Sequence, residues 1–161
     1  MVIAFIGVTT IFGLLVLGIR SKLQAIRSQT LTQRADGGWN VPLAAAFSGL
    51  RDVPWIATTQ SNIAPLLVLH EKDFEYRVVR LQRRPYSDIA LVDIRTTIGT
   101  VNLVLEFNDS ARDFSGNTAS LENATKALAL FEQKGCRLTV RAQALVRAMD
   151  AKEDPRQKSL M

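Results

Sequence analysis

Apolar residues recur with three different spacings along this chain, and each spacing predicts a different kind of element. Residues 2–19 form an apolar run of eighteen residues without a charged side chain, interrupted only by Thr9 and Thr10. Between Trp55 and Gly116, apolar residues recur at every second position in several short runs, which is typical of half-buried β-strands. From Ser120 onward they recur at every third or fourth position, which indicates amphipathic helices. The pattern predicts an apolar N-terminal segment, then a sheet, then helices.

The apolar run predicts a transmembrane helix over residues 1–20. Its eighteen residues extend about 27 Å at ~1.5 Å per residue, close to the ~30 Å hydrocarbon core of a bilayer. A cleavable signal needs basic residues before the run and a small-residue cleavage site after it. Arg20 is the first charge, however, and it follows the run. We therefore expect an uncleaved single-pass anchor, with residues 1–19 in the bilayer. Thr9 and Gly13 are spaced as small-xxx-small, so a homo-oligomer stays an open hypothesis.

The charge distribution predicts the orientation of this anchor. Of the formal charge of +5, four units come from Arg20, Lys22, Arg27 and Arg34, because residues 1–35 contain no acidic side chain. Short basic flanks stay on the cytoplasmic side, so we expect an inner-membrane protein with its N-terminus outside and its C-terminal domain in the cytoplasm. The single cysteine agrees with a reducing compartment. Since the basic excess is confined to the juxtamembrane segment, it gives no reason to expect nucleic-acid binding.

After the anchor, the sequence predicts a basic juxtamembrane linker over residues 21–40 and one small domain. Gly37 and Gly38 mark the linker. Residues 41–135 are expected to form the β domain with a capping helix, residues 136–150 a second helix and residues 151–161 a disordered tail. The segment from Trp39 to Pro54 stays undecided between a helical turn and a buried strand.

Alternation and turn residues predict a series of strands in the β domain. Strands joined by two to five residues must run antiparallel, so we expect an antiparallel meander. The predicted strands are Trp55–Thr59, Leu66–Glu71, Phe74–Leu81, Ile89–Thr97, Val101–Phe107 and Arg112–Gly116.

The helices are predicted from capping residues and from an apolar stripe. Ser120 is a candidate N-cap, Gly135 a candidate terminator, and Thr139 a candidate start for the second helix. The stripe of the first helix consists of Leu121, Ala124, Leu128 and Phe131. That of the second consists of Leu138, Ala142, Leu145 and Met149.

A bent antiparallel sheet followed by an amphipathic helix is the arrangement that a pleckstrin-homology-like (PH-like) barrel requires. The run Leu66–Arg77, followed by Arg84–Ile89 and Val92, resembles bacterial PH-like domains that are often found beside membrane helices. In that pattern a hairpin with an acidic turn leads to an aromatic-Ser-Asp-Ile segment and a Val three residues later. The resemblance covers about residues 55–131. It implies an α+β fold: a transmembrane helix, then a PH-like antiparallel β-barrel or bent sheet capped by a C-terminal helix.

The resemblance implies a binding or scaffold module. Two positions depart from the pattern, since Tyr86 stands where Trp is common and the helix after Ser120 lacks the Trp of eukaryotic PH helices. No ligand residue is carried over, because the basic phosphoinositide signature of the first hairpin has no counterpart around Lys72.

No catalytic constellation is visible in the sequence. His70, the single histidine, has no placed nucleophile nearby in the sequence and is best interpreted as a surface or turn residue. Cys136 has no second cysteine and is best interpreted as a structural thiol. Asp88 and Asp93 are five residues apart, on opposite faces of a strand, and no spacing typical of metal or phosphate binding occurs. We predict a protein that is not an enzyme and that needs no cofactor or metal.

Four arginines, Arg77, Arg80, Arg83 and Arg84, lie at a predicted strand end and in the loop after it. Their guanidinium groups are suited to bind phosphate or carboxylate. The alternative interpretation is a solvated strand face, paired with the acidic residues Glu75, Asp88 and Asp93.

The leading hypothesis is therefore a membrane-anchored cytoplasmic PH-like module that contacts a protein partner through a strand edge or the groove beside the helix. The alternative is a peripheral contact with anionic lipid headgroups through the arginine cluster.

Overall fold

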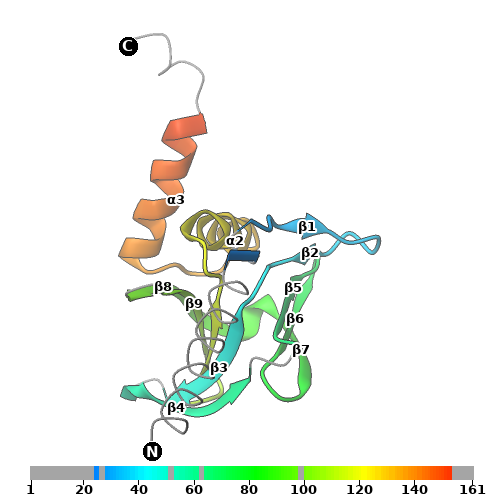
Figure 1. The fold of residues 1–161 in the computed structure, drawn as a ribbon, viewed down its shortest axis with the longest axis vertical. Coiled ribbons are helices and arrows are strands. Elements are labelled where there is room, and N and C mark those ends of the chain that lie inside the picture. Colours follow the sequence, from blue (N-terminus) through cyan, green and yellow to red (C-terminus); the bar gives the residue numbers. More distant parts are fainter. Residues whose placement is uncertain (1–23, 26–27, 51–52, 62–63, 98–99, 154–161) are drawn as a thin grey trace, which may run out of the picture.

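The computed structural model describes residues 24–25, 28–50, 53–61, 64–97 and 100–153. They form an α+β fold, as expected, with two antiparallel sheets and, in this described part, the helices α2 and α3 after the last strand (Figure 1). Within these ranges no helix is long and apolar enough to cross a membrane. The predicted transmembrane helix and its flanking Arg20, Lys22 and Arg27 lie outside the described residues.

In the part of the chain that the structure describes, each sheet contains five strands, and all neighbouring strands are antiparallel. In spatial order, sheet A consists of β1 (Thr32–Gln33), β2 (Trp39–Asn40), β5 (Leu66–Leu69), β6 (Asp73–Arg77) and β7 (Leu81–Pro85). Sheet B consists of β4 (Val53–Ser61), β3 (Ala45–Leu50), β10 (Arg112–Asn117), β9 (Thr100–Phe107) and β8 (Ile89–Thr97).

The segment between β2 and β3 ties the two sheets together. The Val41 N–H donates to the Leu67 carbonyl of sheet A at 3.0 Å, and the Ala44 N–H donates to the Asn117 carbonyl of sheet B at 2.7 Å. The connecting segment is therefore hydrogen-bonded to both sheets as the chain crosses from one to the other. The expected meander is confirmed for β5–β6 and for β8–β9–β10, but it does not extend over all predicted strands, because β4 pairs with β3 and because β7 and β8 lie in different sheets.

Two segments left without strands by the sequence analysis belong to the sheets. The undecided region from Trp39 to Pro54 contains β2 and β3, and the predicted linker over residues 21–40 is too long because β1 and β2 are part of sheet A. Gly37, at φ +81°, lies in the turn between them, where the Arg34 N–H donates to the Gly38 carbonyl. Strands of two residues are too short to show alternation, so the sequence could not reveal them.

The strand β7 was predicted as a loop. Its side chains are mostly exposed, because β7 lies at the edge of sheet A, and an exposed polar edge strand has no apolar alternation to detect. β6 is correspondingly shorter than the predicted strand Phe74–Leu81.

The expected barrel is not formed, because the two sheets stay open. β7 ends sheet A and β8 ends sheet B, and the short helix η1 (Tyr86–Asp88) connects these two edges. β7 is only five residues long and finishes at Pro85, which has no N–H to donate to a further strand.

Helix α2 (Leu121–Gln133) confirms the predicted capping. The Asn123 N–H donates to Ser120 Oγ at 3.3 Å, and Gly135 follows the helix at φ +81°. Its buried face consists of Asn123, Ala124, Thr125, Ala127, Leu128 and Phe131. Leu121, predicted on this stripe, is instead 46% exposed, because the first helical position points away from the sheets.

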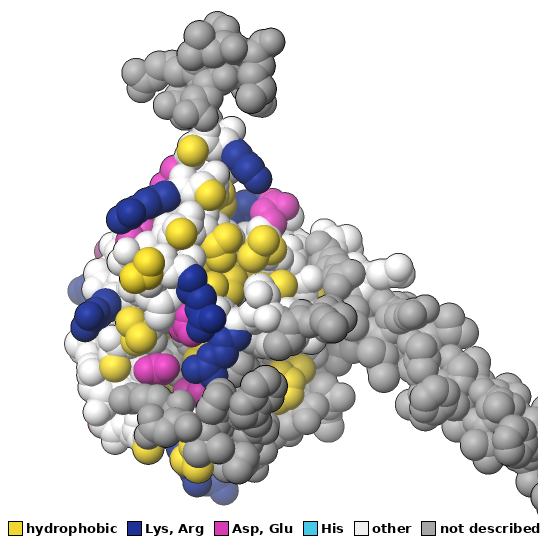
Figure 2. Space-filling view, turned by 90° about the vertical axis from the view of Figure 1, so that its left-hand side faces the viewer, with side chains coloured by type: hydrophobic (Ala, Val, Ile, Leu, Met, Phe, Trp, Pro, Cys, Tyr) yellow, Lys and Arg dark blue, Asp and Glu magenta, His cyan; other side chains and the backbone are white. Residues whose placement is uncertain are grey.

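Helix α3 (Val140–Glu153) begins after Thr139, as predicted, and continues three residues into the predicted tail. Ala142 and Val146 are buried, whereas Leu145 and Met149 are half-buried. The helix extends beyond α2 (Figure 1), and apolar and basic side chains are interspersed along it (Figure 2).

The core between the sheets and α2 is centred on Phe74, which is fully buried. Its ring centroid lies 5.7 Å from Tyr86 of η1, 6.4 Å from Phe107 of β9 and 6.3 Å from Phe131 of α2. Burial of aromatic side chains with offset or edge-on contacts is a strong stabilising contribution. One side chain of sheet A thus packs against sheet B and the helix together.

We predict that Phe74→Ala lowers the free energy of unfolding by about 3–5 kcal/mol, because it leaves a cavity where the elements meet. Leu121→Ala, at an exposed α2 position, is the matched control and should change it by less than about 0.5 kcal/mol. Urea denaturation of the full-length protein in detergent, followed by tryptophan fluorescence, measures both. Equal effects of the two substitutions would contradict this assignment of the core.

Candidate functional site

The four arginines predicted as a cluster lie on and around the β6–β7 hairpin, but their side chains do not converge. Arg83 and Arg84 are consecutive in β7, so they point to opposite faces of sheet A. Arg83 lies 3.0 Å from Asp73 and 3.5 Å from Glu75. The hydrogen bond to Asp73 raises the pKa of Arg83 above its ordinary value.

Arg84 faces the space between the two sheets, where its charge is compensated. Its Nε lies 2.9 Å from Asp88 Oδ2 and its Nη2 lies 2.6 Å from Asp109 Oδ2. Its guanidinium carbon lies 4.5 Å from the centre of the Phe107 ring, a cation–π contact. Burial acts to lower the pKa of Arg84, but the hydrogen bonds to Asp109 and Asp88 outweigh it and raise the pKa. Arg84 is therefore committed to joining β7 to sheet B.

The side chains of the remaining two arginines differ in their contacts. Arg77 Nε donates to the Ala64 carbonyl at 2.8 Å. Arg80 is exposed in the loop between β6 and β7, and among the described residues no ion pair involves it. The structural interpretation of the cluster is thus correct for the pairs Arg83–Glu75 and Arg84–Asp88.

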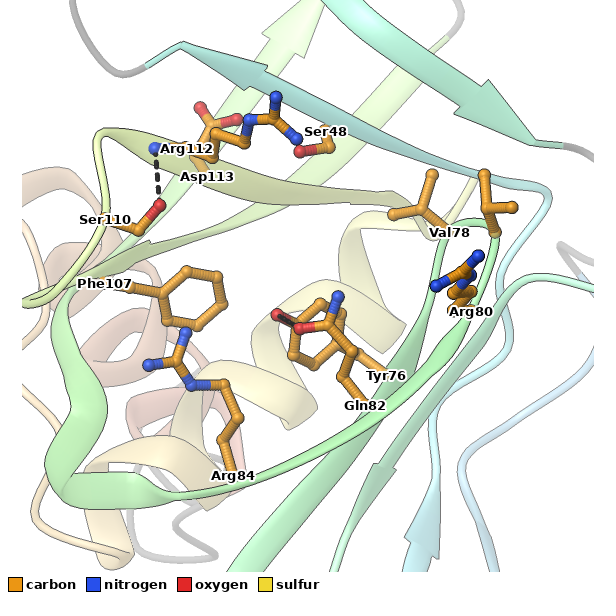
Figure 3. A pocket seen from close by; sticks show the side chains of 11 residues that line it. Ser48, Tyr76, Val78, Arg80, Gln82, Arg84, Phe107, Ser110, Arg112 and Asp113 are labelled. Carbon is orange, nitrogen blue, oxygen red and sulfur yellow. Dashed lines mark hydrogen bonds between the residues drawn. The ribbon is translucent and has the colours of Figure 1, made fainter.

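A cavity of about 280 Å³ opens between the sheets beside the β6–β7 loop (Figure 3). Tyr76 and Phe107 form its apolar floor, and the Tyr76 hydroxyl donates to Gln82 Oε1 at 2.6 Å. Arg80 and Arg112 lie at its rim. The other lining residues are Ser48, Val78, Val79, Gln82, Arg84, Ser110 and Asp113.

Large aliphatic side chains are exposed next to residues that line this cavity. Val79, which lines it, is 65% exposed, and Leu81, on the other side of Arg80 in the sequence, is 55% exposed. Leu50, the cross-strand partner of Arg112, is 37% exposed. Exposed aliphatic residues are therefore neighbours of Arg80 and Arg112 in the chain or across a strand pair.

A second concave surface, which we call the α2 groove, lies between α2, α3 and the segment that enters β1. It has a volume of about 440 Å³. Its apolar side chains are Leu31, Trp39, Ala129, Leu130 and Met149, and its polar ones are Thr30, Lys126 and Gln133.

One hydrogen bond and apolar packing position the residues around the α2 groove. Asn123 Nδ2 donates to the Gln29 carbonyl at 2.7 Å, so α2 holds the segment that precedes β1. Leu31, Trp39 and Leu130 pack against the main core while remaining half-buried. The groove is thus a shallow extension of the core surface that the structure leaves open.

Both outer strands that face the connection η1 are unsuited to accept a further strand. β7 carries Arg83, Arg84 and Pro85, and charged residues with proline protect sheet edges. The chain itself covers β8, since the Val92 N–H donates to the Arg137 carbonyl at 2.8 Å and the Thr139 N–H donates to the Val92 carbonyl at 3.0 Å.

Asp93 is a buried charge that the sequence analysis placed on a solvated face. It is 4% exposed and accepts hydrogen bonds from Thr139 Oγ1 and Arg141 Nε, both at 2.7 Å, and from Arg141 Nη2. Arg95 Nε is 3.6 Å away. Burial acts to raise the pKa of Asp93, but the hydrogen bonds from Arg141 and Thr139 outweigh it and lower the pKa. Thr139 and Arg141 follow Asp93 in the chain by 46 and 48 residues. No local pattern in the sequence therefore predicts these contacts.

His70 and Cys136 each have their own surroundings. His70 lies in the turn after β5, its Nε2 is 3.7 Å from Glu75 Oε1, and its carbonyl accepts from the Tyr86 hydroxyl at 2.7 Å. Cys136 is buried behind α2. Within the described ranges, no three His, Cys, Asp or Glu side chains are grouped so that they could hold a metal ion.

No protein-family model matches the sequence, and comparison with curated proteins finds no similar chain.

We predict that Cys136 reacts slowly with thiol reagents. Burial raises its pKa from 9.0 to about 11, which lowers the thiolate fraction near neutral pH about 100-fold, and the thiolate is the reactive form. The rate of reaction with a chromogenic disulfide at pH 7.5 should rise by at least that factor when urea unfolds the protein. Equal rates in the folded and unfolded protein would contradict the burial of this thiol.

Proposed function

We propose that this chain is a PH-like, non-catalytic binding module at the cytoplasmic face of a membrane, and that its α2 groove accepts an apolar segment of a protein partner. The membrane part of the proposal is supported by the apolar run at residues 2–19 and the basic residues that follow it.

The strand order supports the PH-like part. β2 and β3 are consecutive in the chain and pair with β5 and β4 respectively, while β3 also pairs with β10. Two antiparallel sheets joined through the β2–β3 segment thus precede α2, which directly follows β10. The resemblance implied antiparallel strands followed by a packed helix, and this order agrees with it.

The α2 groove is the surface at which we expect the partner segment to bind. A partner segment needs either an unpaired strand edge or an apolar groove. Of the edge strands in the described residues, β7 is protected by charges and proline, β8 is covered by residues 137–139 and β1 has only two residues, so β4 is the remaining edge. The groove instead presents the half-buried Leu31, Trp39 and Leu130 together, and its volume is typical of sites that bind apolar groups.

The charges around the groove favour a protein segment over a lipid headgroup there. Lys126, the lysine that lines it, is paired with Glu122 at 2.6 Å. Partner recognition at such a site depends on apolar anchors surrounded by polar residues.

We predict that a photo-crosslinking amino acid at Gln133, in the full-length protein in native membranes, gives a discrete adduct with one other protein. Gln133 lines the groove and is exposed, whereas its neighbour Glu132 is exposed without lining it. The same probe at Glu132 should give at least fivefold less adduct. Ala129→Trp, which fills the groove, should remove the Gln133 adduct.

Equal adducts from residues 132 and 133, or a Gln133 adduct that persists with Ala129→Trp, would overturn the assignment of the groove.

A second function is favoured by the rim of the cavity between the sheets. Val79 and Leu81 are exposed on either side of Arg80, and Arg112 lies across the cavity. Aliphatic side chains with nearby cations suit an anionic bilayer surface, where each basic residue contributes about 1 kcal/mol. The side chains of Arg77, Arg83 and Arg84 already bind other groups of the protein. Arg80 and Arg112 would therefore make this contact.

For this second function, we predict that a spin label at residue 79 in the full-length protein senses lipid in bilayers with anionic lipid and water in zwitterionic bilayers. Accessibility to oxygen and to a water-soluble nickel complex measures its depth. A label at Val140, which is 84% exposed, should sense water in both. Arg80→Gln with Arg112→Gln should return the residue 79 label to water, and a depth that is independent of lipid charge would eliminate this function.

A further inference from the structure

The position of α3 decides whether the α2 groove is complete. Met149 of α3 lines the groove opposite Leu31 and Trp39. If α3 moved away from α2, the groove would lose this wall and become an open surface. The contacts that hold α3 are therefore contacts that shape the proposed binding site.

The contacts of α3 are concentrated in its first half. Ala142 and Val146 are buried, but residues 147, 148, 150, 151 and 152 are exposed, and the helix extends beyond α2 (Figure 1). Because the second half has little apolar surface to bury, it adds little to the docking of the helix. The wall of the groove is thus held mainly through the start of α3.

Asp93 is the main polar contact at that start. Its carboxylate accepts from the Thr139 hydroxyl and from two nitrogens of Arg141, so one buried group of β8 binds the N-cap and the first turn of α3. The main-chain hydrogen bonds of Val92 place these residues directly beside Asp93. Arg141 itself is 58% exposed at its side chain, so solvent can compete for it.

Removal of Arg141 leaves a buried carboxylate with less compensation. Arg95 Nε is 3.6 Å from Asp93, but Arg95 also lies within 3.8 Å of Glu106 and 3.9 Å of Asp113, so it is shared among three acidic groups. A buried charge that loses its partner is strongly destabilised unless the structure moves to hydrate it. Displacement of the start of α3 is the movement that admits water to Asp93.

We propose that Asp93, with Thr139 and Arg141, is a latch that holds α3 as the movable wall of the α2 groove. This inference depends on the proposed function of the groove for its biological meaning. In the latched state the groove is formed; in the released state α3 swings from α2 and the groove is lost. A partner segment that contacts Met149 and Leu130 together stabilises the latched state, and by thermodynamic reciprocity a weaker latch weakens binding.

We predict that Arg141→Gln in the full-length protein speeds amide hydrogen exchange of residues 140–149 at least tenfold. It should also broaden the distance distribution between spin labels at Gln133 and Met149. Arg147→Gln removes an exposed arginine of the same helix and is the matched control, which should change neither quantity. Arg141→Lys retains the charge and should restore much of the protection.

The latch is overturned if Arg141→Gln leaves both the exchange rates and the label distances as in the wild type. Its control over the groove is overturned if both change while the Gln133 photo-adduct keeps its wild-type yield. A wild-type protein that gives no adduct, with the exchange and distance changes still present, supports the latch and contradicts only the proposed partner binding.

Discussion

The packing of Phe74 against three separate elements is the constraint on which the rest of the structure depends. Two open sheets have no common ladder of hydrogen bonds at the β7–β8 side, so side chains must join them there. Phe74 contacts the rings of Tyr86, Phe107 and Phe131, and Arg84 adds a charged contact on Phe107. Because Phe131 belongs to α2, this packing also places the helix that forms one wall of the proposed binding groove.

Charge pairing divides the arginines of this chain into structural and available groups. Arg83 and Arg141 each bind a carboxylate of a neighbouring strand, and Arg84 binds carboxylates of η1 and of the turn after β9; ion pairs of this kind fix geometry more than they stabilise. Arg80 and Arg112 are left at the cavity rim beside exposed aliphatic residues. The same residue type thus joins elements of the fold in one place and, in the second function proposed above, would contact an anionic surface in another.

The sequence predicts those features of the fold that depend on local pattern. The long strand β8 and helix α2 with its Ser120 cap follow from alternation and capping, and both are confirmed. The strands β1, β2 and β7 were missed because they are very short or lie at an exposed edge. The α2 groove and the Asp93–Arg141 pair join segments far apart in the chain, and no alternation or spacing reveals such contacts. The sequence analysis named a groove beside the helix as a kind of binding surface, but it did not identify the residues that line it.

The central claim is that one aromatic core fixes both sheets and α2 in a single arrangement that leaves the α2 groove open. Nuclear Overhauser effects between assigned aromatic rings in detergent-solubilised full-length protein test it most directly. The account predicts effects from the Phe74 ring to both Phe107 and Phe131, together with effects from the Trp39 indole to the Leu130 methyl groups. A Phe74 ring with contacts inside sheet A alone would contradict the account.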